Sequence, residues 1–213
     1  MHKLIESTEI FIKSRLESDI SDGHDYTHTC RVVKHALALC DQLPEADRTI
    51  VHLAALLHDV ARPEESASAG KIDHAVAGSE IAAGFLQTLE LEEPRKKAIV
   101  QAIGEHRYRS GNKPTSLESQ ILYDADKLDS LGAVGIARAF LFAGHVGAKL
   151  HNTAEAALAG AAYSREDTAY REYLVKLSHL PEKMQTAPGK ILAEERKVFM
   201  QEFFDRLNEE FFD

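Results

Sequence analysis

Apolar residues recur at helical spacing along most of the chain, and this periodicity is the feature that most limits its fold. Between residues 2 and 19, for example, Leu4, Ile5, Phe11, Ile12 and Leu16 lie at intervals near 3.6. No segment shows a convincing strand pattern, and the sequence has neither an internal repeat nor a low-complexity tract. The pattern predicts an all-α protein of about nine helices.

Capping and breaking residues divide this pattern into segments. Asp25, Asp47 and Asp73 precede apolar runs and are predicted N-caps. Capping-box spacing at residues 115–118 and 164–167 opens two further helices. The expected helices are 2–19, 25–43, 47–59, 73–91, 94–107, one from 115 through residue 126, a glycine-punctuated stretch at 132–147, one ending near 179, and a long one from about 190 to 212.

Residues 61–72 interrupt the periodicity with the sequence ARPEESASAGKI, which is rich in Pro, Ser, Gly and charge. Such a composition is typical of a mobile loop. The segment directly follows the pair His58-Asp59, and loops beside functional residues often cover them. We therefore expect a lid over this pair.

Composition limits the class of protein. A chain of 213 residues with 44% hydrophobic residues is long enough for one well-packed domain. Its apolar runs fall far short of the roughly 18 residues of a membrane span, and the N-terminus lacks a signal-like stretch, so we expect a cytoplasmic protein with no membrane contact. The formal charge of -9 argues against binding duplex nucleic acid but permits small phosphorylated substrates.

The two cysteines are predicted to be reduced thiols. Cys30 and Cys40 lie ten residues apart on one expected helix, which separates their backbones by roughly 15 Å. A disulfide requires Cα atoms within about 7 Å.

Four residues form an ordered set that suits a divalent metal ion: His28, His58, Asp59 and Asp126. Two imidazoles and two carboxylates accept Mn, Mg, Fe, Co, Ni or Zn. Any one of them alone is most simply a surface residue. Asp59 and Asp126, however, each follow a core-type apolar run, where a carboxylate is costly to bury unless it is paired or metal-bound. We expect separate helices to bring the four to one site.

The segments that carry these residues resemble the HD-domain metal-dependent phosphohydrolases. They are GHDYTHTCRV around His28, AALLHDVAR around His58 and Asp59, and DADKLDSLGAVGIARAF around Asp126. The resemblance covers about residues 20–145. It implies an all-helical bundle in a single HD domain over residues 1–213, with a metal-binding core at about 20–145 and C-terminal helices at about 164–212 packed on it. The four residues would be the metal ligands.

Residues 177–184 and 189–196 resemble a smaller bacterial and archaeal subgroup. Some members of that subgroup cleave a nucleoside triphosphate to the monophosphate and pyrophosphate. The resemblance implies a divalent cofactor, with Mn or Mg first and Fe, Co, Ni or Zn as alternatives, and a small phosphorylated substrate, foremost a nucleotide.

Two more histidines, His74 and His106, fall between the His-Asp pair and Asp126. This order resembles superfamily members that bind two metals, although the spacing from Asp59 to His74 is short. Substrate binding, or protonation of the leaving group, is the interpretation favoured for both, and a capping or surface role is the simplest alternative.

Basic residues are needed to offset the charge that develops on a phosphoryl group. Arg62 and Lys127 lie nearest to the expected ligands in sequence and are the predicted catalytic cations, with Asp59 as ligand and candidate general base. Arg138 and Lys190 are predicted to bind substrate. Asp129 is a candidate to orient a ligand or a basic residue.

The sequence thus predicts a metal-dependent phosphohydrolase, with nucleotide pyrophosphohydrolase activity first. The alternatives are a phosphomonoesterase or phosphodiesterase on another small ester, and a catalytically silent metal or nucleotide sensor. An aromatic stripe on the last helix offers a homodimer interface, but packing on its own domain is the favoured interpretation; the stripe comprises Phe199, Phe203, Phe204, Leu207, Phe211 and Phe212.

Overall fold

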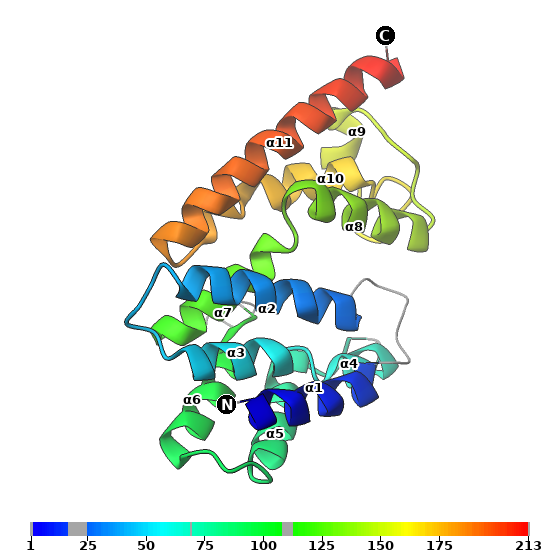
Figure 1. The fold of residues 1–213 in the computed structure, drawn as a ribbon. Helices are drawn as coiled ribbons and strands as arrows, with labels where there is room; N and C mark the ends of the chain where they lie inside the picture. Colours follow the sequence, from blue (N-terminus) through cyan, green and yellow to red (C-terminus); the bar gives the residue numbers. More distant parts are fainter. Residues whose placement is uncertain (1, 17–24, 69, 108–112, 213) are drawn as a thin grey trace. The chain divides into compact units, whose positions relative to one another are not determined.

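The computed structural model describes residues 2–16, 25–68, 70–107 and 113–212, and these are helical with no strand among them. The all-α prediction is confirmed (Figure 1). The described helices are α1 (His2–Leu16), α2 (Tyr26–Cys40), α3 (Arg48–Leu57), α4 (Arg62–Ala67), α5 (His74–Leu86), α6 (Glu93–Glu105), α7 (Leu117–Leu128), α8 (Gly132–His145), α9 (Ala154–Ala159), α10 (Ala169–Val175) and α11 (Ala187–Phe212), with short 3-10 helices η1 (Leu177–His179) and η2 (Pro181–Lys183) before α11.

Backbone contacts divide the chain into two compact units. The described residues up to Asp126 form the first, and those from Lys127 onward form the second. The boundary therefore falls inside α7. The expectation of a single domain over residues 1–213 stays a prediction.

Helix α3 is the centre of the first unit. It packs against α1, α2 and α6, and its residues from Thr49 to Leu57 are buried except for the half-buried His52. The sequence explains this position, because a helix that is apolar on nearly all sides is stable only in a core. Asp47 caps the helix by accepting hydrogen bonds from two backbone N–H groups in its first turn. His58 and Asp59, which follow directly, are therefore buried in the interior of the first unit.

Helices α1 and α5 close the first unit around this centre. Phe11 of α1 stacks on Phe85 of α5 with ring centroids 4.1 Å apart. Ile12 and Leu16 form a buried cluster with Val60, which comes just after the His-Asp pair. The α1 contacts thus hold the chain segment that leaves α3.

The expectation of a mobile loop at residues 61–72 is wrong for its first half, which forms α4. Pro63 lies in the first turn of this helix, where a missing N–H costs nothing, and acidic residues follow it. Arg15 of α1 pairs with Glu64 and donates a 3.1 Å hydrogen bond to the carbonyl of Val60. These contacts fix the segment.

Other boundaries also differ from the sequence-based expectations. The Oγ of Ser116, rather than that of Thr115, accepts the backbone N–H of Ser119 at the start of α7. Thr168, rather than Ser164, caps α10. Helix α2 ends at Cys40, three residues early, and α5 ends at Leu86. The described residues hold two short α-helices, α4 and α9, beyond the expected nine. Cys30 and Cys40 are free thiols on one helix, as predicted.

In the second unit, part of the aromatic stripe of α11 packs on its own unit. Phe204 is buried, with ring centroids 4.7 Å from Tyr173 and 5.4 Å from Tyr170. Phe199, Phe211 and Phe212 are exposed, and a homodimer stays a prediction. No helix in the described part of the chain combines the length and the apolar character that crossing a membrane requires.

Candidate metal centre

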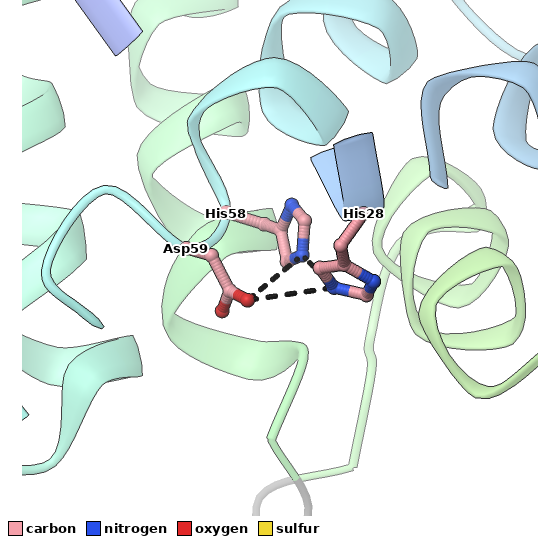
Figure 2. Close-up of side chains that lie close together, drawn as sticks. All are labelled: His28, His58 and Asp59. Carbon is pink, nitrogen blue, oxygen red and sulfur yellow. Dashed lines mark hydrogen bonds and ion pairs between the residues drawn. The ribbon is translucent and has the colours of Figure 1, made fainter. Parts of the chain in front are cut away.

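The four predicted metal ligands meet in the first unit. His28 lies in the first turn of α2, His58 ends α3, and Asp126 lies in the last turn of α7. The Nε2 atom of His28 is 3.4 Å from Asp59 Oδ2 and 3.5 Å from Asp126 Oδ1. The Nε2 atom of His58 is 3.5 Å from the same Asp59 Oδ2. Figure 2 shows how His28, His58 and Asp59 point toward one another.

His58 presents an unprotonated nitrogen to this cluster. Its Nδ1 lies 2.8 Å from the carbonyl oxygen of Ala55, an acceptor to which the ring must donate its N–H. The neutral ring then carries a lone pair on Nε2, which faces Nε2 of His28 at 3.3 Å. The bond to Ala55 also satisfies one of the carbonyls left unpaired at the end of α3.

A second cluster adjoins the first and consists of Asp59, His74 and His106, all buried. The Nε2 atoms of His74 and His106 are 3.1 Å apart. They lie 3.5 Å and 3.7 Å from Asp59 Oδ1. The structure therefore brings together six residues: the four expected ligands and the two histidines whose role was open.

The histidines of the second cluster are oriented in the same way as His58. His106 ends α6 and directs Nδ1 to the carbonyl of Ile103 at 2.6 Å, three residues back. His74 begins α5 and directs Nδ1 to Glu65 Oε2 at 2.8 Å. These hydrogen bonds assign the protons to Nδ1 and leave both Nε2 atoms as acceptors. Neither ring is an ordinary surface histidine.

Asp59 joins the two clusters through its two carboxylate oxygens. Oδ2 faces the histidines of the first cluster, and Oδ1 faces those of the second. A carboxylate with one oxygen toward each of two donor sets has the arrangement of a bridging ligand. If each donor set held a divalent ion, Asp59 would contribute one oxygen to each.

Burial keeps His58 and His74 neutral, which metal ligation requires. Burial lowers the pKa of His58 to about 4, although Asp59 acts in the opposite direction. Burial likewise lowers the pKa of His74 to about 2. The carbonyl ends of α3 and α6 also point their partial negative charge toward this region, because His58 and His106 terminate these helices. The local field therefore favours positive charge in this region, while burial disfavours placing that charge on the rings of His58 and His74.

The donor set fits a divalent ion. Atoms bound about 2.1 Å from one ion lie roughly 3.0 to 3.4 Å apart around an octahedron or a tetrahedron. In the first cluster, His28 Nε2 lies 3.3 to 3.5 Å from the facing atoms of His58, Asp59 and Asp126, and His58 Nε2 lies 3.5 Å from Asp59 Oδ2. Imidazole and carboxylate donors together suit Mn, Fe, Co, Ni or Zn and do not single out one of them.

Arg62 lies against this centre. Its Nε is 3.0 Å from Asp59 Oδ1 and its Nη1 is 2.7 Å from Glu65 Oε2. Burial lowers the pKa of Arg62, but the surrounding carboxylates, Asp59 foremost, outweigh burial and raise it. The guanidinium thus stays charged beside the donor atoms, as a charge-offsetting role requires.

Glu65 is the residue of this centre that sequence reasoning missed. It contacts His74, Arg62 and Arg107 from α4. The signal was present, because a proline followed by two glutamates is typical of a first helical turn. The Pro-Ser-Gly composition of the segment as a whole outweighed it.

The remaining predicted site residues belong to the second unit. Lys127 is half-buried in the last turn of α7, and Lys190 is exposed on α11. Arg138 pairs with the buried Asp129, with Nη1 and Oδ2 2.8 Å apart, so Asp129 does orient a basic residue. The catalytic role of Lys127 and the substrate contacts of Arg138 and Lys190 stay predictions.

Two further candidates are accounted for by their positions in the chain. Asp25 caps α2 by accepting the backbone N–H of His28 at 3.0 Å, the interpretation that the sequence favoured. His24 precedes His28 by four residues, which makes it a weak candidate ligand on sequence grounds, and it lies outside the described residues.

The sequence profile of the HD domain matches residues 25–131 of this chain. The Bacillus subtilis protein YpgQ is 34% identical over 214 residues, which covers 98% of this chain and 94% of YpgQ. The chain therefore belongs to the HD-domain family and is a metal-dependent phosphohydrolase of the HD type.

Solved structures agree with this assignment. A crystal structure of Bacillus subtilis YpgQ in complex with ADP matches with a TM-score of 0.75 and 28% identity, covering 97% of each chain. A HD-superfamily hydrolase from Bacillus thuringiensis matches with a TM-score of 0.76 and 32% identity, covering 98% of this chain and 97% of the other.

Proposed function

We propose that this phosphohydrolase acts on nucleotides and converts a nucleoside triphosphate to the monophosphate and pyrophosphate. The observation that carries the metal-dependent chemistry is the convergence of His28, His58, Asp59 and Asp126 from three helices and the turn after α3. The nucleotide part is supported by the related protein YpgQ, which was crystallised with ADP.

We assign the first metal ion to His28, His58, Asp59 and Asp126. We assign a second to Asp59, His74 and His106, since Asp59 turns a different oxygen toward each cluster. A divalent ion held here would make a bound water more acidic and would polarise a phosphoryl oxygen. This assignment departs from the substrate-binding role first expected for the two histidines.

The protein residues then have separable tasks. Asp59 is within reach of both clusters and is the acceptor best placed to take a proton from an attacking water. Arg62 offsets negative charge on the substrate phosphates. In the reaction, the water oxygen bonds to the α-phosphorus and the bond from this phosphorus to the bridging oxygen breaks. Pyrophosphate leaves with that bridging oxygen.

The test is a reconstitution experiment. Protein stripped with a chelator is reloaded in turn with Mn²⁺, Mg²⁺, Co²⁺, Ni²⁺ or Zn²⁺ and incubated with nucleoside and deoxynucleoside triphosphates. The products are resolved by phosphorus NMR. With ¹⁸O-labelled water, attack at the α-phosphorus places the label in the monophosphate, and attack at the β-phosphorus places it in pyrophosphate.

The proposal predicts pyrophosphate and labelled monophosphate, formed only with metal. Orthophosphate as the sole phosphate product would overturn the pyrophosphohydrolase assignment in favour of phosphomonoesterase chemistry. Nucleotide binding without turnover under every metal would favour the sensor alternative.

A further inference from the structure

Glu65 is the shared partner of three charged or titratable side chains beside the second cluster. Its Oε2 accepts from Nδ1 of His74 at 2.8 Å and from Nη1 of Arg62 at 2.7 Å. Its Oε1 accepts from Arg107. The Glu65 side chain is only 13% exposed, so these bonds form away from bulk solvent.

Arg107 competes with Glu65 for the same histidine nitrogen. Nη1 of Arg107 lies 3.0 Å from Nδ1 of His74. A guanidinium only donates hydrogen bonds. If it donated to Nδ1, the ring proton would have to sit on Nε2 instead. Nε2 would then point an N–H, rather than a lone pair, at Asp59 and His106.

From this competition we infer that Glu65 is a positioning residue that selects the metal-binding tautomer of His74 and thereby creates the second metal site. The carboxylate accepts the Nδ1 proton, and its other oxygen holds Arg107. A carboxylate that orients a ligand histidine in this way typically contributes 10- to 100-fold to metal affinity. The inference rests on the proposed second metal ion and names what makes that ion bind.

The charges beside the second cluster also support this role of Glu65. Two guanidinium groups, those of Arg62 and Arg107, lie beside a cluster that is assigned a divalent cation. Glu65 pairs with both and offsets their repulsion of the ion. Asp73 contributes less, since its Oδ2 is 3.6 Å from Arg107 and its side chain is more exposed.

The fold holds Glu65 in this position through its neighbour. Glu64 pairs with Arg15 of α1, which also binds the carbonyl of Val60. Successive residues of α4 thus point to different partners: Glu64 braces the helix on α1, and Glu65 faces His74. Glu64→Gln is a matched control, since its amide oxygen can still accept from Arg15 and keep α4 in place, while it removes the same charge from the same helix as Glu65→Gln.

The experiment measures Mn²⁺ binding to chelator-stripped full-length protein by equilibrium dialysis and elemental analysis. The proteins are wild type, Glu65→Ala, Glu65→Gln, Glu64→Gln and the double variant Glu65→Ala with Arg107→Ala. Circular dichroism checks that each is folded. Glu65→Gln keeps an acceptor of the same size, so it supplies the answer if the alanine variant does not fold.

Wild type and Glu64→Gln should bind two ions per chain. Glu65→Ala should keep the first affinity and weaken the second by about 10- to 100-fold. Glu65→Gln should fall between wild type and Glu65→Ala. Removal of Arg107 in the double variant should restore part of the lost affinity, because the competing donor is gone. A purely structural role for Glu65 gives no such rescue.

Failure of this inference is distinct from failure of the proposed function. Two ions bound with wild-type affinity in Glu65→Ala or Glu65→Gln would overturn the role of Glu65 and leave the second site standing. Loss of the second ion without rescue by Arg107→Ala would overturn tautomer selection. A single ion in wild type at saturating Mn²⁺ would overturn the second site itself and, with it, this inference.

Discussion

The Nε2 atoms of His74 and His106 face each other at 3.1 Å, although each ring directs its Nδ1–H to another acceptor. Two bare nitrogens have no proton to share at this distance, and their lone pairs repel. A cation between them turns the repulsion into coordination. In the first cluster, His58 likewise directs its Nδ1–H to Ala55 and turns a bare Nε2 toward Nε2 of His28 at 3.3 Å.

Asp59 faces both clusters, whereas each histidine faces only one, so substitution of Asp59 should affect metal binding more than substitution of a single histidine. Asp59→Asn should lose both metal ions, because each cluster uses one of its oxygens. His58→Ala should lose the first ion and His106→Ala the second. Turnover should fall by more than about 100-fold in Asp59→Asn and His58→Ala, since several kcal/mol of transition-state stabilisation disappear.

Elemental analysis of the metal content per chain tests which ions each variant loses, and circular dichroism checks that each variant is folded. His179→Ala is the control, because His179 is an exposed histidine of η1 with no assigned role in the site, and its replacement should change neither metal content nor turnover. Full turnover with bound metal in His58→Ala would contradict the assignment of the first site.

The buried histidines predict that the metal-free protein loses stability in mild acid. His58 and His74 have folded pKa values of about 4 and about 2, below the ordinary value of 6.5. As the pH falls below 6.5, His58 and His74 bind protons in the unfolded chain but stay neutral in the folded protein. The free energy of unfolding should therefore decrease steadily from pH 6.5 down to about 4.

Urea unfolding of chelator-treated protein between pH 7.5 and 4.5 measures this dependence. The variant His58→Gln should show a shallower decrease, since one of the neutral rings is gone. A stability that stays level or rises over this range would contradict neutral burial of the histidines.

Metal removal should lower the melting temperature. A ligand that binds only the folded protein at 100 times its Kd adds about 2.7 kcal/mol of stability. For chains of this size, 1 kcal/mol corresponds to about 2–4 °C. We therefore expect a decrease of about 5–10 °C on chelation. Calorimetry with and without Mn²⁺ checks this, and the shift should be absent in Asp59→Asn.

Arg62 should affect turnover more than metal binding. It pairs with Asp59 and Glu65 beside the centre, but it is not a ligand. Arg62→Gln is expected to lower kcat by about 10- to 100-fold, a loss of about 1.4–2.7 kcal/mol, while metal content stays near wild type. A normal kcat with a raised KM would instead mean that Arg62 binds the substrate equally well in the ground state and in the transition state.

The core of the fold was predictable because the signals were local. The apolar run of α3 can be stable only when buried, and the three aspartate caps before α2, α3 and α5 form the predicted bonds. Helix α4 was missed because its stability comes from Arg15, almost fifty residues away. Thr115 does not cap α7 as predicted, because its backbone N–H and its hydroxyl both donate to the carboxylate of Glu105.

The metal centre was predictable only in part for a similar reason. His28, His58, Asp59 and Asp126 carry the resemblance to the HD family, so their order identified them. The order of His74 and His106 pointed to the site but left their role open, because their pairing depends on how α5 packs on α6. The contact of Glu65 with His74 was not predictable, because it requires both the unexpected helix α4 and the position of α5.

An anomalous difference map from a crystal of this protein grown with Mn²⁺ is the most direct test of the metal centre. We expect a peak about 2.0 to 2.3 Å from Nε2 of His28 and of His58 and from the nearer oxygens of Asp59 and Asp126. A second peak is expected beside His74 and His106, about 3.5–4 Å from the first. A map in which Mn²⁺ occupies neither position, from protein that hydrolyses its nucleotide in the same buffer, would show that these residues do not hold the catalytic metal.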